Sequence, residues 1–145
     1  GFVCANAGID LSNVEEGRAA LLPLNSDRSA RRIRDSLKHR LGFAVAVIVS
    51  DTFGRPWRRG VTDVAIGCAG LRPVVDLRGT TDALGRELQV TEVAIVDEIA
   101  SAAELVMGKA EGIPVAVVRG LDASWLGCGS IGDDVVRKPA DDLFR

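Results

Sequence analysis

Apolar residues recur at helical spacing in two parts of the chain. A helix is predicted from Ser26 to about Leu41, and Gly42 follows as a stop signal. Its apolar face carries Ala30, Ile33, Leu37 and Leu41. A second helix is predicted after Thr91 and ends at Gly108 or Gly112. Its apolar positions are Val93, Val96, Ala100, Ala103 and Met107.

Continuous apolar runs predict strands that are covered on both faces. Four runs have this character: 44–49, 61–69, 73–77 and 114–118. Polar or glycine-rich loops are expected at 53–60 and 78–86, and in the tail from Gly120. Because strands and helices are interleaved without strict alternation, the sequence predicts an α+β (mixed α/β) fold. No linker interrupts it, so residues 1–145 are expected to form one domain.

Composition excludes several classes of protein. Hydrophobic residues make up 47% of the 145 residues, which excludes a disordered chain. A net charge of −2 and 4% aromatic residues without tyrosine argue against nucleic-acid binding and against attraction to an anionic membrane. Three scattered cysteines and one histidine argue against a zinc site or disulfide framework. We therefore expect a cytoplasmic protein that binds neither nucleic acid nor membranes.

Carboxylates that end apolar runs are the first candidates for chemistry. Asp51 follows the run 44–49 and is flanked by the hydroxyl residues Ser50 and Thr52. Oxygen ligands of this kind suit a hard divalent cation such as Mg²⁺. The alternative is that Asp51 caps the following turn. Asp10 also ends an apolar stretch and could supply a second carboxylate, although its local sequence equally fits a turn.

Arginines in the segment after Asp51 could bind phosphate. Arg55 and Arg58 are the principal candidates, because guanidinium groups pair with phosphate oxygens through two parallel hydrogen bonds. The alternative is a solvated loop in which Trp57 fills the core.

Two glycine motifs do not predict nucleotide binding by themselves. Residues 127–132 match G-x-G-x-x-G literally, but the match lies in the loop-like tail and does not join a strand to a helix. Gly108-Lys109 resembles the end of a phosphate loop, but no upstream glycine has the required spacing and no Ser or Thr follows Lys109. From the residues alone, the sequence indicates an α+β domain with a metal and phosphate site.

Ordered sequence matches along nearly the whole chain resemble one family, the coenzyme F-420:L-glutamate ligases. The most distinctive match is the segment Ser50-Asp51-Thr52-Phe53-Gly54-Arg55-Pro56-Trp57-Arg58. Further matches are Ala5-Asn6-Ala7-Gly8-Ile9-Asp10, Asp76-Leu77-Arg78-Gly79, Gly85-Arg86-Glu87-Leu88, Met107-Gly108-Lys109 and Val117-Val118-Arg119-Gly120.

The resemblance implies a GTP-dependent ligase that adds L-glutamate to a deazaflavin coenzyme precursor through an acyl phosphate. It implies two divalent ions, Mg²⁺ or Mn²⁺, with K⁺ as a further cofactor, and a homodimer. By resemblance, Asp10 and Asp51 are ligands of one divalent ion and Thr52 of a second. Asn13, Gly108 and Lys109 correspond to residues that contact GTP.

The sequence departs from the family pattern in two places. Some relatives have an acidic metal ligand where Lys109 stands, so either Lys109 replaces the second ion's charge or Glu111 serves as the ligand. Family members also have an N-terminal portion before the segment that matches Gly1, so the chain is expected to be part of a longer one. Two other functions remain open: a metal-dependent phosphohydrolase, and a non-catalytic module that binds a nucleotide or phospholigand.

Overall fold

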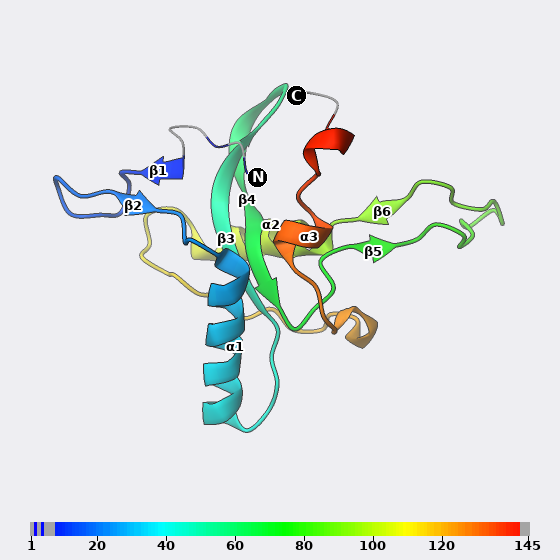
Figure 1. Ribbon diagram of the computed structural model, residues 1–145, viewed down its shortest axis with the longest axis horizontal. Coiled ribbons are helices and arrows are strands. Elements are labelled where there is room, and N and C mark those ends of the chain that lie inside the picture. The colour runs from blue at the N-terminus through cyan, green and yellow to red at the C-terminus, as the bar shows by residue number, and fades with distance from the viewer. Residues whose placement is uncertain (1, 3, 5–7, 143–145) are drawn as a thin grey trace.

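The computed structural model describes residues 2, 4 and 8–142, so residues 5–7 of the first matching segment lie outside the described part. Its centre is a long antiparallel hairpin made of β3 (Val47–Arg55) and β4 (Arg58–Ala69), with helices packed against it (Figure 1). The remaining elements are β1 (Ile9–Asp10), β2 (Ala20–Leu21), α1 (Ser26–Leu41), β5 (Val75–Asp76), β6 (Glu92–Val93), α2 (Ile95–Met107), η2 (Ala123–Trp125), α3 (Ile131–Asp134) and η3 (Pro139–Asp141). The α+β prediction is confirmed.

The β3–β4 hairpin is longer than predicted. The apolar run 44–49 was expected to end before Asp51, but the strand continues to Arg55, and 53–60 is not an open loop. Thr52 pairs with Asp63 in the antiparallel register. The cross-strand pairing extends the strand through polar positions that carry no apolar signal, so Asp51 lies within a strand and not at its end.

The first helix forms where the sequence predicts it. The side chain of Asn25 accepts a hydrogen bond from the backbone N–H of Arg28 at 2.7 Å and so caps the helix start. Gly42 ends the helix with a positive φ of 77°, and its N–H donates to the carbonyl of Lys38. A left-handed residue at this position explains why glycine is the stop signal.

The N-terminus of α1 is bound tightly to β4. A Cβ built on Gly67 would lie 2.3 Å from the backbone carbon of Ser26, so only glycine allows this approach. The carboxylate of Asp27 accepts hydrogen bonds from the backbone N–H groups of Cys68 and Ile131, each at 2.9 Å. One side chain of α1 thereby joins β4 to α3.

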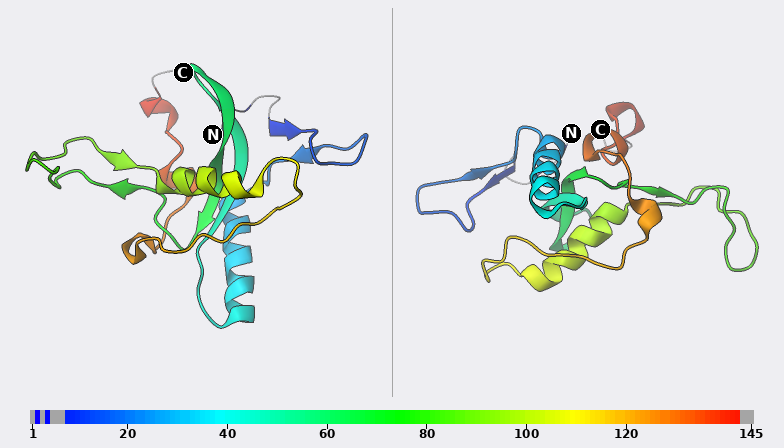
Figure 2. Two further views of the ribbon diagram at one scale, coloured as in Figure 1. Left: turned by 180° about the vertical axis from the view of Figure 1, so that it is seen from behind. Right: turned by 90° about the horizontal axis from the view of Figure 1, so that it is seen from below.

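The second helix covers the other side of the hairpin from α1 (Figure 2). Ile95, Val96 and Ala100 of α2 are buried. The buried core cluster consists of Ala65, Cys68, Leu71, Ile95, Val96 and Ile131. Polar side chains of α2 also bind β4, because Asp97 accepts from the N–H of Ala65 at 2.9 Å.

The predicted strand at 114–118 is wrong. This segment has no regular structure, and Val115 and Val117 are 70% and 76% exposed. A run of apolar residues forms a strand only when a partner strand satisfies its backbone, and none pairs with it among the described residues.

The described chain leaves much apolar surface in contact with solvent. Its accessible surface is 10968 Å², whereas a compact monomer of this mass exposes about 7,100 Å². Leu24, Leu84 and Val90 are among the large apolar side chains that are more than 80% exposed. This excess surface is suited to contacts with further protein.

Among the described residues, none of the helices has the length and apolar character required to cross a bilayer.

Candidate functional site

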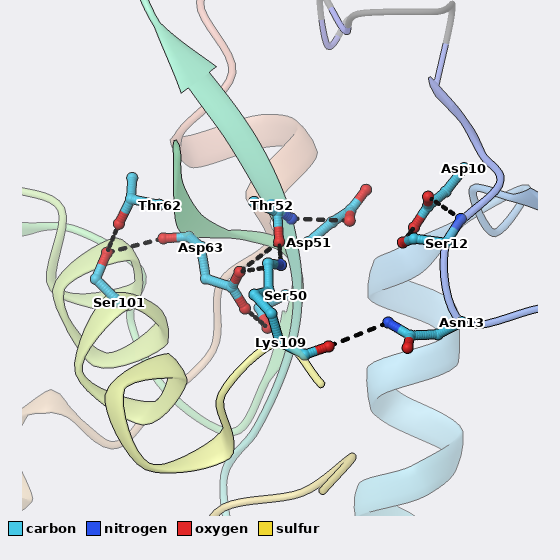
Figure 3. Close-up of polar contacts among 10 residues, drawn as sticks. All are labelled: Asp10, Ser12, Asn13, Ser50, Asp51, Thr52, Thr62, Asp63, Ser101 and Lys109. Carbon is cyan, nitrogen blue, oxygen red and sulfur yellow. Dashed lines mark hydrogen bonds and ion pairs between the residues drawn. The ribbon is translucent and has the colours of Figure 1, made fainter. Parts of the chain in front are cut away.

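The loop after α2 brings a lysine onto the β3–β4 hairpin. Gly108 ends α2 with φ 63° and ψ 176°, a conformation open almost only to glycine, and the chain then turns back toward the hairpin. The Lys109 ammonium donates to the hydroxyl of Thr52, and its Nζ lies 3.8 Å from Oδ1 of Asp63 (Figure 3). The Lys109 side chain is 56% exposed, so its charge also faces solvent.

Asp63 is the residue that receives these contacts, and it is not among the candidates predicted from the sequence. Asp63 is buried, with 6% of its surface exposed. Ser50 donates its hydroxyl to Oδ2 at 2.9 Å, and Thr52 donates its hydroxyl to Oδ1 at 2.8 Å. A charged residue inside the apolar run 61–69 was the available signal, because a carboxylate is buried only when hydrogen bonds and a cation compensate it.

We call Ser50, Thr52, Asp63 and Lys109 the Asp63 cluster. Ser50 and Thr52 are two positions apart on β3, so they share one face of the strand, and Thr52 lies opposite Asp63 on β4. The α2 helix supports the cluster from behind, because the Ser101 hydroxyl donates to the backbone carbonyl of Asp63 at 2.8 Å.

Asp51 emerges on the other face of β3, because successive side chains of a strand alternate. Its Oδ1 accepts a hydrogen bond from the backbone N–H of Thr52 at 2.8 Å. In the view of Figure 3 the carboxylates of Asp51 and Asp10 are directed toward each other, from β3 and from the end of β1. The two residues are 41 positions apart in the sequence.

Asp10 is an exposed residue at the end of β1, just before a turn. Oδ1 accepts from the backbone N–H of Ser12 at 2.7 Å, and Oδ2 accepts from the Ser12 hydroxyl at 2.9 Å. The bonds from the backbone and hydroxyl of Ser12, with a further contribution from the positive charge of Lys109, lower the pKa of the Asp10 carboxyl. The turn alternative thus describes its local structure. An ionised carboxylate has about four acceptor positions, so the turn leaves capacity for a cation.

Asn13 connects this turn to the loop after α2. Its side-chain N–H₂ donates to the backbone carbonyl of Lys109 at 3.3 Å (Figure 3). Asn13 has a φ of 52°, in the left-handed region that asparagine tolerates better than most residues. Three segments that are distant in sequence, around Asp10, Thr52 and Lys109, therefore meet at one place.

Arg55 and Arg58 are not part of this meeting point. They pair with each other where the hairpin turns, and Nη2 of Arg55 lies 3.4 Å from the carbonyl of Arg59. Four residues of strand separate Arg55 from Asp51, or about 13 Å. Trp57 is 86% exposed, so it does not fill the core as the alternative proposed. The role of Arg55 and Arg58 as phosphate ligands stays a prediction.

Asp10 and Asp51 are the residues that could hold a divalent cation. Asp10 and Asp51 offer carboxylate oxygens, which hard cations prefer. Within the described ranges, no group of three or more His, Cys, Asp or Glu residues is arranged to hold a metal. A cation at Asp10 and Asp51 would therefore complete its shell with water and substrate oxygens, as Mg²⁺ commonly does.

Comparisons with known proteins agree with the resemblance seen in the sequence. Residues 1–120 match the model of the family described as F420-0:Gamma-glutamyl ligase. The chain is 48% identical over 146 residues to coenzyme F420:L-glutamate ligase of Methanocaldococcus jannaschii, and 48% identical over 146 residues to that of Methanothermobacter thermautotrophicus. The corresponding enzyme of Methanopyrus kandleri is 47% identical over 148 residues.

These alignments cover 100% of this chain but only 57%, 58% and 59% of the three relatives. The chain thus spans somewhat more than half the length of the relatives it matches. Both the family model, which covers most of the chain, and the identity over its whole length lead to the same assignment: the chain belongs to the F420-0:gamma-glutamyl ligase family.

Proposed function

We propose that this chain is the metal-binding part of a GTP-dependent ligase that joins L-glutamate to a deazaflavin coenzyme precursor. The family assignment and the names of the relatives support ligation of glutamate to coenzyme F420. GTP, the acyl phosphate and the metal are proposals that follow from the resemblance and from the chemistry of the site.

The proposed reaction has two steps. A carboxylate oxygen of the precursor attacks the γ-phosphorus of GTP, GDP leaves, and an acyl phosphate forms. The glutamate amine then attacks the acyl carbon, phosphate leaves, and the amine releases a proton to solvent. Both steps concentrate negative charge on phosphate oxygens, so the site needs fixed positive charge near them.

The residues of this chain divide that work. Asp10 and Asp51 would hold a Mg²⁺ or Mn²⁺ ion, which when bound neutralises phosphate oxygens. Lys109 offers an exposed ammonium next to the hairpin, and lysine binds phosphate as a point charge. Asn13 donates to the backbone carbonyl of Lys109, and the resemblance implies that Asn13 contacts the nucleotide. Gly108 supplies the turn that directs the chain from α2 to Lys109.

One observation carries the proposal: three family motifs that are far apart in sequence meet at Lys109. Its Nζ contacts the 50–58 motif at Thr52, and its carbonyl accepts from Asn13 of the 5–13 segment. Its charge also acts on Asp10. A fold that only stabilised itself would not need to gather these exposed polar residues at one place.

A second copy of the chain is proposed as a partner. The excess accessible surface and the exposed large apolar side chains favour burial against further protein, and the resemblance implies a homodimer. A cytoplasmic location and a K⁺ ion remain predictions.

The test uses the protein expressed from its complete gene, with GTP, Mn²⁺ or Mg²⁺, L-glutamate and the deazaflavin precursor. We expect GDP release that requires both L-glutamate and the deazaflavin precursor, with a matching amount of glutamyl product. Asp51→Asn should lower the rate roughly 100-fold, because a carboxylate proposed to bind the metal is lost. This corresponds to an increase of about 3 kcal/mol in the activation free energy. Asp35→Asn is the control, since Asp35 lies on the exposed face of α1 and pairs with Arg34.

The same assay separates the alternatives. Equal GDP release with and without the acceptors would identify a phosphohydrolase. Tight metal-dependent GTP binding without turnover would identify a binding module. Wild-type metal affinity and activity in Asp51→Asn would show that the metal site lies elsewhere.

A further inference from the structure

The Asp63 cluster already contains a cation. Asp63 is buried, and both of its oxygens accept hydroxyl hydrogen bonds, from Ser50 and from Thr52. A positive charge, that of Lys109, lies 3.8 Å from its Oδ1. The ammonium therefore compensates a carboxylate that would otherwise be costly to bury.

A second divalent ion at Thr52 does not fit these residues. A hydroxyl has one proton to donate and two lone pairs. Thr52 donates its proton to Asp63 and accepts from the Lys109 ammonium, so the one lone pair that remains lies beside a positive charge. An ammonium and a divalent ion on the same oxygen would repel each other strongly at this short range.

Glu111 does not offer a replacement ligand. Its Oε2 accepts a hydrogen bond from the backbone N–H of Ala110 at 2.9 Å. The carboxylate lies over Gly108, where a Cβ would be 2.6 Å from the same oxygen. Glu111 therefore closes the turn after α2, whereas Lys109 reaches the hairpin.

We propose that Lys109 is the resident cation of this site, held by Asp63 through Thr52, and that the site therefore binds one divalent ion and not two. The proposal rests on the proposed function, because the remaining ion is the one at Asp10 and Asp51. Asp63 is a positioning residue: its charge keeps the ammonium beside the hairpin, where it would meet a bound phosphate. The ammonium then supplies the charge that a second ion would contribute.

The test counts protein-bound Mn²⁺ by equilibrium dialysis in the presence of GDP, with the protein expressed from its complete gene. We expect one Mn²⁺ per chain in the wild type. Lys109→Met should bind two, because Asp63 and Thr52 become available to an ion. Lys138→Met is the matched control, since Lys138 is also exposed, and it should bind one.

Double variants assign the additional ion. Lys109→Met combined with Asp63→Asn should bind one Mn²⁺ again, because the carboxylate of the vacated position is gone. Lys109→Met combined with Thr52→Val should also bind one Mn²⁺. This second double variant replaces the first if the variant at the buried Asp63 does not fold, which circular dichroism would report.

Other outcomes are equally decisive. Two Mn²⁺ in the wild type, or one in Lys109→Met, would overturn the resident-cation proposal and leave the proposed function standing. One Mn²⁺ in Asp51→Asn with one in the wild type would instead overturn the assignment of the ion to Asp51, and so the metal part of the proposed function.

Discussion

Replacing Asp27 tests whether one side chain holds the fold together around the hairpin. Its carboxylate accepts from the N–H groups of Cys68 and Ile131 at 2.9 Å and from that of Gly132 at 3.2 Å. Two of these donors are partly buried and one is exposed. Asp27→Ala removes the acceptor while the donors remain in place.

The expected cost follows from these contacts. A hydrogen bond to a charged group contributes about 1.5–3 kcal/mol to the free energy of unfolding. A buried donor left without a partner destabilises the fold by a similar amount, about 1–3 kcal/mol. The exposed N–H of Gly132 can bind water instead. We therefore expect Asp27→Ala to lower the free energy of unfolding by about 3–5 kcal/mol, a large share of the roughly 5–15 kcal/mol typical of folded proteins.

Urea denaturation followed by circular dichroism measures this loss. The m-value, which is the slope of the unfolding free energy against urea concentration, should not change. Asp27→Asn keeps an acceptor oxygen but loses the charge, so a cost of about 1–2 kcal/mol is expected. Asp35→Ala is the control on the same helix, because it loses only an exposed pair with Arg34. A cost for Asp27→Ala within about 0.5 kcal/mol of the control would refute the reasoning.

Three further predictions concern single residues. Gly108→Ala should destabilise the protein by about 1–3 kcal/mol in the same assay, because φ 63° with ψ 176° is strained for any residue with a Cβ; an unchanged midpoint would contradict this. Burial, with added repulsion from nearby carboxylates, raises the pKa of the Cys68 thiol to about 12. Iodoacetamide at pH 8 should therefore label the exposed Cys128 and spare Cys68 until the protein unfolds, as peptide mass spectrometry would show. Hydrogen bonds from Arg78 lower the pKa of Asp76 to about 2, so the stabilisation from this pair is present above the ordinary pKa of 3.8 and is lost as the pH falls toward 2. Carbon-detected NMR titration should show this pKa, and Arg78→Gln should return it toward 3.8.

The helices were predictable from the sequence because their signals are local. Ser26 and Gly42 mark the ends of α1, and the spacing of Val96 and Ala100 gives the buried face of α2, although Val93, predicted for this helix, lies in β6. Register and strand length depend on a partner strand. The polar stretch after Val49 gives no periodic signal, so the continuation of β3 to Arg55 appears only once β4 pairs with it.

The candidate site was predictable in part for the same reason. Asp10, Asp51, Thr52 and Asn13 follow from family motifs, and the structure brings Asp10, Thr52 and Asn13 near Lys109. Asp63 belongs to none of the family motifs recognised in the sequence. Its place in the site becomes visible only from its burial and from its pairing with Thr52 across the hairpin. Arg55 and Arg58 looked close to Asp51 in sequence, but a strand separates residues by about 3.3 Å each, so the hairpin carries them away from it.

The α2 helix fixes both ends of the contact between Lys109 and Asp63. Ser101 holds the backbone carbonyl of Asp63, and Gly108, seven residues later, turns the chain so that Lys109 reaches the side chain of the same residue. Seven helical residues span about 10 Å, so the cation and its carboxylate are positioned from one rigid element. The Asp10 segment is held differently: Asp10 pairs with Ala20 in the short β1–β2 ladder, its carboxylate accepts from Ser12, and Asn13 donates to the carbonyl of Lys109 at 3.3 Å. The resident charge is therefore built into the packed part of the fold. The Asp10 carboxylate, which would meet a divalent ion, lies outside it on a short exposed strand.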